Sequence, residues 1–227
     1  MRIARLLGLC ALLAACESPI LAGRPSSDVY TFALDTDPPA ILRWPTGSTV
    51  RLYVVPSGDA GRDALLTAAT AAGAAAWNRE ALFGEFRLDP VDRIESADVV
   101  VSWSDVLLPV ETEQCRPQLQ RAVTTFCIDG FETETPALRP FPLRPPADPA
   151  AGDVRMLVTF LAAEALFPDR LPRLVAHELG HVLGIGRHSA DPGDLMVSPD
   201  PIRDSPSRRD AATVQVLYHT RADVGTD

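Results

Sequence analysis

Short stretches of this chain alternate between apolar and polar residues or are continuously apolar, and these patterns predict β-strands. Four such stretches are clear, over residues 48–55, 85–88, 97–103 and 122–128. The first also concentrates β-branched residues, whose side chains pack well on a pleated sheet. A fifth apolar run, residues 154–160, fits either a strand or the start of the next helix.

Three longer stretches predict helices. Residues 59–80 are rich in alanine, a strong helix former, and we expect Gly73 within them to allow close packing against a sheet. A second helix is predicted over residues 171–183, ending at Gly184. A third begins near Ser207, where the sequence resembles a capping box.

The order of these elements predicts an α+β domain, with a twisted mixed sheet of about four to five strands and three main helices. The chain has 227 residues, enough for one sizeable domain with tails. We place the domain at residues 47–221, followed by a short tail, 222–227. Residues 132–151 are rich in proline and are expected to form a long loop inserted in the domain.

The N-terminus has the pattern of a signal peptide. Arginines precede an apolar run that is too short to span a bilayer permanently, which predicts a signal peptide over residues 1–15. The end of this run, from Leu13 to Cys16, resembles a bacterial lipobox. The resemblance implies that Cys16 is the first mature residue and carries the lipid. The alternative is an ordinary signal peptide cleaved near Ala15.

A lipobox implies a protein outside the cytoplasm, anchored by lipid to a bacterial membrane or cell surface. Glu17 follows the cysteine in place of the aspartate that often retains lipoproteins in the inner membrane, so an outer membrane is favoured. Residues 16–46 are rich in proline, serine and aspartate. We expect them to form the lipidated end and a flexible tether to the domain.

Cys115 and Cys127 are the two thiols that remain if residues 1–15 are removed and Cys16 carries lipid. Outside the cytosol such a pair is usually oxidised, which predicts a disulfide between them. On the loop-entropy model this bond would stabilise the fold by roughly 3 kcal/mol. Metal ligation is the weaker hypothesis, because the pair lacks the close spacing of zinc-binding cysteines.

The chain has a formal net charge of −9 and contains arginine but no lysine. An acidic chain without a basic stripe is a poor nucleic-acid binder, so no nucleic-acid partner is expected. The charge pattern gives no indication of an oligomeric state.

Candidate metal ligands concentrate between His177 and His188, a segment that holds three of the four histidines of the chain. His177 and His181 are four residues apart, so on a helix they share one face and can bind one Zn²⁺. Glu178 follows the first histidine and is the candidate general base, placed to take a proton from a metal-activated water. His188 returns after the turn expected at Gly184 as the third candidate ligand.

This segment, together with the methionine that follows it, resembles the metzincin metalloproteases, and most closely their matrixin-type bacterial members. Their signature is H-E-x-x-H-x-x-G-x-x-H followed by a methionine turn. The similarity extends over residues 48–104 and 155–218, and implies a metzincin-like catalytic domain with one catalytic Zn²⁺. The residues that the resemblance assigns are the ligands His177, His181 and His188, the general base Glu178, Gly184 at the helix-ending turn and Met196 beneath the metal.

The sequence departs from this signature at one position. The strict spacing places the third ligand at Arg187, whose guanidinium stays charged and cannot bind zinc. His188 comes one residue later, and Gly186 gives the backbone the freedom to absorb the insertion. The shift is similar to that in some bacterial relatives, so His188 is the expected ligand and Asp191 the reserve candidate.

The predicted function is zinc-dependent hydrolysis of peptide bonds, with extracytoplasmic proteins or peptides as substrates. Residues 122–128 are a candidate edge strand that pairs with an extended substrate, unless the proline-rich insert covers it. Two alternatives remain open: a zinc-binding but inactive surface lipoprotein that acts as a binding module, and a zinc hydrolase of a non-protein amide. The presence of Glu178 argues against the first, because a purely binding site has no need of that base.

Overall fold

The described part of the chain is an α+β fold built on one six-stranded sheet. The computed structural model describes residues 28–34, 39–105, 122–128, 143–144 and 156–223. In chain order the strands are β1 (Ser48–Val54), β2 (Phe86–Val91), β3 (Val99–Ser104), β4 (Ala122–Ile128), β5 (Leu143–Arg144) and β6 (Met156–Leu161). Within β4 and β5, only the side chains of Ala122 and Thr124 are described.

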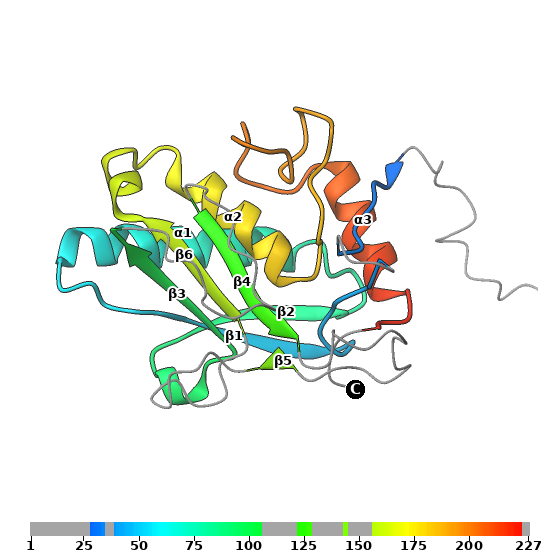
Figure 1. The fold of residues 1–227 in the computed structure, drawn as a ribbon, viewed down its shortest axis with the longest axis horizontal. Helices are drawn as coiled ribbons and strands as arrows, with labels where there is room; N and C mark the ends of the chain where they lie inside the picture. Colours follow the sequence, from blue (N-terminus) through cyan, green and yellow to red (C-terminus); the bar gives the residue numbers. More distant parts are fainter. Residues whose placement is uncertain (1–27, 35–38, 106–121, 129–142, 145–155, 224–227) are drawn as a thin grey trace, which may run out of the picture.

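The sheet is mixed, in the order β2-β1-β3-β6-β4-β5. The first four strands in this order are parallel, and β4 runs antiparallel to β6 (Figure 1). β5 pairs only with Cys127 and Ile128 at the end of β4. From Ala122 to Phe126, β4 therefore has β6 on one side and, among the described residues, no strand on the other. The predicted strand over residues 122–128 is confirmed, and β5 pairs with its last two residues.

Three α-helices accompany the sheet in the part of the chain described. They are α1 (Ala60–Asn78), α2 (Leu171–Val182) and α3 (Arg208–Tyr218), with short 3₁₀ helices η2 (Ile94–Ser96) and η4 (Ala162–Leu166) between strands and helices. α1 and α2 pack against each other on one face of the sheet, and α3 lies at one end of it (Figure 1). None of the described helices is both long and apolar enough to cross a membrane.

The helix boundaries follow the local sequence. The Asp59 carboxylate accepts hydrogen bonds from the N–H groups of Gly61 and Arg62 at the start of α1. At the start of α3, Ser207 and Asp210 form a complete capping box, which confirms that prediction.

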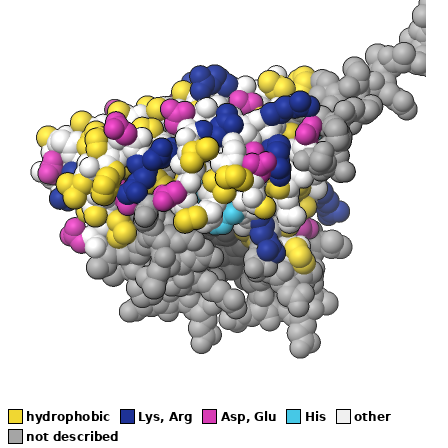
Figure 2. Space-filling view, turned by 90° about the horizontal axis from the view of Figure 1, so that it is seen from above, with side chains coloured by type: hydrophobic (Ala, Val, Ile, Leu, Met, Phe, Trp, Pro, Cys, Tyr) yellow, Lys and Arg dark blue, Asp and Glu magenta, His cyan; other side chains and the backbone are white. Residues whose placement is uncertain are grey.

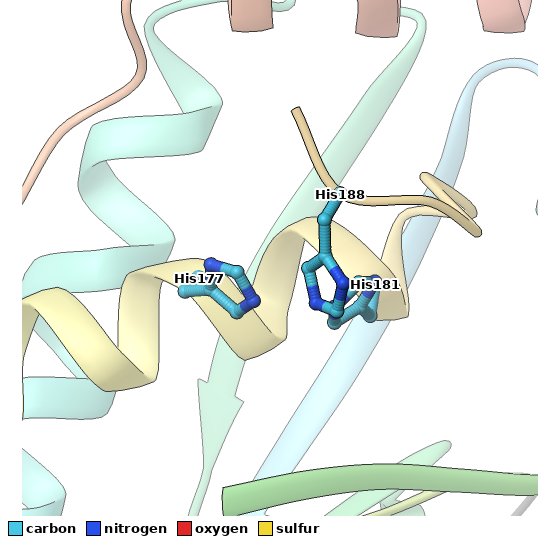
Figure 3. A group of neighbouring side chains, drawn as sticks. All are labelled: His177, His181 and His188. Atoms are coloured by element: carbon cyan, nitrogen blue, oxygen red, sulfur yellow. The ribbon is translucent and has the colours of Figure 1, made fainter. Parts of the chain in front are cut away.

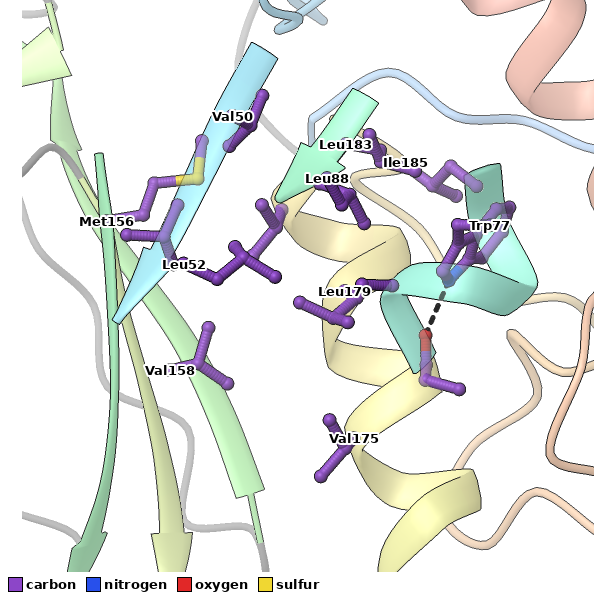
Figure 4. Close-up of a cluster of buried hydrophobic side chains, with 14 of the residues drawn as sticks. Val50, Leu52, Trp77, Leu88, Met156, Val158, Val175, Leu179, Leu183 and Ile185 are labelled. Atoms are coloured by element: carbon purple, nitrogen blue, oxygen red, sulfur yellow. Dashed lines mark hydrogen bonds between the residues drawn. The ribbon is translucent and has the colours of Figure 1, made fainter. Parts of the chain in front are cut away.

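The core lies between the sheet and the two central helices. Val50 and Leu52 of β1, with Met156 and Val158 of β6, point from the sheet towards Leu179 of α2 (Figure 4). All five side chains are buried. The alternating buried positions of β6 settle the ambiguous run near residue 156 as a strand, because a helix would bury every third or fourth residue instead.

α1 is held close to α2 by Trp77 and Gly73. The Trp77 indole Nε1–H donates a 2.7 Å hydrogen bond to the Ala176 carbonyl (Figure 4). A Cβ on Gly73 would lie 3.2 Å from the Ala176 Cα, which is tighter than nine in ten real Cβ contacts. Gly73 therefore allows close packing against helix α2, and the prediction that it packs against a sheet is wrong.

The structure corrects two predictions, one about the proline-rich insert and one about where the packed domain begins. The proline-rich segment, predicted as loop alone, contributes strand β5, which brings the sheet to six strands instead of four to five. Residues predicted to belong to the tether also pack on the domain: Leu42 and Trp44 are buried, and the Trp44 Nε1–H donates to the Val182 carbonyl at 2.8 Å. The packed domain therefore begins earlier than residue 47.

Several predictions lie outside the described residues. These are the signal peptide over residues 1–15, the lipidated Cys16 and the cysteine pair, because Cys115 is not described and only the backbone of Cys127 is placed, in β4.

Candidate metal centre

Helix α2 carries two of the predicted ligands on one face. His177 and His181 are one turn apart, and their ring centroids are 4.9 Å from each other (Figure 3). His177 is buried and His181 is half-buried. The helix holds them firmly, because apolar neighbours such as Val175 and Leu179 anchor the opposite side of α2 in the core.

The chain turns back after α2 at Gly184 and brings His188 to the pair. Gly184 has a φ of +105°, a left-handed conformation that glycine adopts without strain. The Ile185 N–H donates to the Gly180 carbonyl at 3.1 Å and closes the turn. His188 Nε2 then lies 3.3 Å from His181 Nε2 (Figure 3). The predicted helix-ending role of Gly184 is confirmed.

The structure brings His188 close to the other two histidines, and not Arg187 or the reserve candidate Asp191. One nitrogen from each of His177, His181 and His188 lies within 4.8 Å of the other two. The Arg187 side chain points away and donates to the Ala33 carbonyl. Asp191 accepts hydrogen bonds from the Gly193 N–H and from Arg209. The turn after α2 thus places His188 beside the other two histidines.

The hydrogen bonds of the first two imidazoles determine which nitrogens are available. His177 Nδ1 is 2.8 Å from the Leu195 carbonyl oxygen, and His181 Nδ1 is 2.6 Å from the Ile185 carbonyl oxygen. A carbonyl only accepts, so each Nδ1 carries the hydrogen and donates it. In the neutral imidazoles, Nε2 is left with a lone pair on both rings, which is the form that binds a metal.

One pair of these nitrogens has the spacing of two ligands on a single metal ion. Two nitrogens bound tetrahedrally at about 2.1 Å from one ion would be about 3.4 Å apart, and His181 Nε2 and His188 Nε2 are 3.3 Å apart. Burial lowers the pKa of His177 to about 3 and that of His188 to about 4, and lowers the pKa of His181 as well. All three rings are therefore neutral near pH 7, so the three histidines can hold a metal ion together.

Glu178 is buried beside this cluster, with 4% of its surface exposed. Burial raises the pKa of its carboxyl to about 7, although hydrogen bonds from the Thr124 hydroxyl and backbone oppose the shift. The Thr124 hydroxyl oxygen is 2.7 Å from Glu178 Oε2. A carboxyl with a pKa near neutrality can take up and return a proton at pH 7.

Met196 packs against α2 at Gly180, the residue before His181. A Cβ on Gly180 would collide with the Met196 Sδ and would lie 2.8 Å from a Trp77 ring carbon. Met196 is fully buried. A side chain at position 180 would force Met196 and Trp77 to shift, so the helix and the loop after His188 are tightly packed together.

A buried hydrogen-bond network, which the sequence analysis missed, fixes the loop that contains Met196. The Asp210 carboxylate accepts from the N–H groups of Leu195 and Met196, at 2.7 and 3.3 Å, and from the Tyr30 hydroxyl at 2.6 Å. Next to it, the Asp194 carboxylate accepts from the hydroxyls of Ser189 and Ser207. The capping-box pattern located Asp210, but only the fold shows that its carboxylate also serves a distant loop.

Figure 2 shows one face of the molecule, on which a histidine side chain is visible among charged and apolar side chains. A comparison of the sequence with protein-family models gives no match, and a comparison with curated proteins gives none either. The geometry of the site therefore carries the functional argument.

Proposed function

We propose that this chain is a zinc-dependent endopeptidase of the metzincin type, similar to the matrixin-type bacterial members. One observation carries the proposal: three neutral imidazole nitrogens converge beside a buried carboxyl whose pKa is raised to about 7. A site that only bound metal would need the histidines, but it would gain nothing from burying Glu178 next to them.

The surrounding fold supports the same proposal. A mixed sheet with an antiparallel strand next to the site, a helix carrying His177 and His181, and a glycine turn leading to His188 agree with a metzincin-like domain. The packing of Met196 against Gly180 is the arrangement expected of a methionine turn.

The roles of the residues follow from their positions. His177, His181 and His188 would hold a zinc ion, which when bound would supply Lewis-acid polarisation of a carbonyl and lower the pKa of water towards neutrality. Glu178 takes a proton from the attacking water and returns it to the leaving amine. The open side of β4, from Ala122 to Phe126, offers backbone groups to an extended peptide, which would pair with it as an added strand.

The location of the enzyme is part of the proposal. A signal peptide over residues 1–15 and lipid on Cys16 would anchor it to a bacterial membrane, with the outer membrane favoured, and its substrates would be extracytoplasmic proteins. A disulfide between Cys115 and Cys127 would be compatible with that compartment.

Zinc content and peptide cleavage, measured together, test the proposal. The full chain, purified in mild detergent, is compared with its Glu178→Gln variant for zinc bound per chain and for cleavage of a mixed peptide library. We expect about one zinc per chain in both proteins, and cleavage only by the parent, abolished by a chelator and restored by zinc.

Other outcomes separate the alternatives. Zinc in both proteins without cleavage in either would favour an inactive binding module, or a hydrolase of a non-protein amide if simple amides are cleaved. Absence of zinc from the parent would contradict the metal site and the endopeptidase proposal with it.

A further inference from the structure

The Glu178 carboxylate has a partner on a different element of the fold. Thr124 lies in the middle of β4, paired across the sheet with Val158 of β6. Its hydroxyl oxygen is 2.7 Å from Glu178 Oε2 and 3.2 Å from the Glu178 carbonyl oxygen. The hydroxyl has one hydrogen to donate, and the shorter contact to the charged oxygen is the stronger bond.

This contact crosses from the sheet to the helix at the site. Glu178 sits on α2 between the turns of His177 and His181, and α2 contacts β4 directly. A glutamate side chain has several rotatable bonds, so burial alone does not select the orientation of its carboxylate. A hydrogen bond from a rigid strand does select it.

We propose that Thr124 is a positioning residue for Glu178: its hydroxyl holds Oε2 and so fixes the orientation of the carboxylate of the residue that follows His177 on α2. This inference rests on the proposed function, because an oriented carboxylate matters for proton transfer and not for binding a metal. Since Thr124 lies on the strand proposed to pair with substrate, it links the position of the peptide to that of the base.

Three variants of the full chain test this role. Thr124→Val removes the hydroxyl and keeps the shape, Thr124→Ser keeps the hydroxyl, and Thr159→Val is a matched control. Thr159 is on β6, between the buried Val158 and Phe160, so its side chain is on the opposite face of the same sheet. Each protein is measured for zinc per chain and for kcat and KM on one cleaved peptide.

We expect Thr124→Val to lower kcat by roughly tenfold to a hundredfold with KM and bound zinc close to the parent values. Thr124→Ser should keep kcat within about threefold of the parent, because it restores the donor. Thr159→Val should behave as the parent. A parental kcat in Thr124→Val, or equal losses in the Val and Ser variants, would overturn the proposal.

A second measurement does not depend on activity. Crystal structures of the zinc-loaded parent and the zinc-loaded Thr124→Val variant report the orientation of the Glu178 carboxylate directly. We expect one orientation in the parent and a rotated or divided one in the variant. An unchanged carboxylate in the variant would overturn the role of Thr124 even if no peptide were cleaved, whereas absence of cleavage with a rotated carboxylate would contradict only the endopeptidase proposal.

Discussion

The hydroxyl of Tyr30 donates a 2.6 Å hydrogen bond to Asp210, a residue on α3 near the other end of the chain. Asp210 in turn accepts from the backbone N–H of Leu195, whose carbonyl oxygen accepts from His177 Nδ1. A continuous series of hydrogen bonds thus runs from the N-terminal segment to a candidate metal ligand. It fixes the ring orientation of His177 and the nitrogen that the ring presents to a metal.

Removal of Asp210 should affect both stability and metal affinity. Asp210→Ala leaves the buried N–H groups of Leu195, Met196 and Ser207 without this acceptor. At about 1–3 kcal/mol for each unsatisfied buried donor, we expect a loss of at least about 3 kcal/mol in the free energy of unfolding. Zinc affinity should fall by roughly tenfold to a hundredfold.

The companion variant Tyr30→Phe removes one donor and leaves the backbone bonds of Asp210 in place. We expect it to cost about 1–2 kcal/mol, with zinc affinity almost unchanged. Urea unfolding and zinc competition titrations measure both quantities. Equal effects of the two variants would show that Asp210 does not hold the loop.

The ligand set can be checked through the stabilisation that zinc provides. Zinc at about a thousand times its dissociation constant should stabilise the protein by about 4 kcal/mol, or roughly 10 °C in Tm for a chain of this size. His188→Ala should lose most of this shift. Asp191→Ala should retain it, because Asp191 is bonded to Gly193 and Arg209. The reverse result would make Asp191 the third ligand.

The turn at Gly184 should tolerate no side chain. Its φ of +105° is unfavourable for alanine, and a Cβ there would also collide with the Leu42 carbonyl. Gly58 is a matched control, since its φ is +86° but nothing lies within 4 Å of the Cβ position. We expect Gly58→Ala to cost about 1–2 kcal/mol and Gly184→Ala roughly 3 kcal/mol or more. Similar costs in urea unfolding would mean that the turn region can relax.

The metal-free protein should lose stability in mild acid. The pKa values of His177 and His188 are lowered from 6.5 to about 3 and about 4, and that of His181 is lowered too. Below about pH 6.5 the unfolded chain therefore binds protons that these buried rings do not, so the free energy of unfolding falls as pH falls. Glu178, whose pKa is raised from 4.5 to about 7, opposes this by binding a proton in the folded state.

His177 and His188 together, less the opposing proton on Glu178, leave a net difference of about one proton between pH 6.5 and 4.5, which corresponds to about 1.4 kcal/mol per pH unit, and the lowered pKa of His181 adds to it. Chemical denaturation of the metal-free chain at several pH values measures this slope. His188→Gln should make it shallower by about one proton. A slope of zero in the parent would contradict the burial of neutral histidines.

The sequence was sufficient to predict those features that depend only on residues close together in the chain. The capping box at Ser207, the glycine turn at Gly184 and the helical spacing of His177 and His181 each depend on a few adjacent residues. The ligand role assigned to His188 also follows from a short turn, and the structure brings this histidine to the pair.

Contacts between distant segments could not be predicted in this way. Nothing near Thr124 in the sequence indicates that its hydroxyl reaches Glu178, and nothing near Tyr30 indicates Asp210. The packing of Gly73 against α2 was misassigned for the same reason, because a glycine shows that something comes close but not what it is. Leu42 and Trp44 lie in a segment of polar, proline-rich composition, which concealed their burial.

The packed N-terminal segment also limits how far the domain can lie from the proposed lipid anchor. Asp28 is already bound to the domain through Arg208, at 3.0 Å. If Cys16 carries the lipid as proposed, only residues 17–27 separate it from Asp28. A stretch of that length spans at most about 40 Å when fully extended. The candidate metal centre would then stay close to the bilayer surface. Its first substrates would be proteins in or next to the membrane, not molecules that diffuse freely in the same compartment.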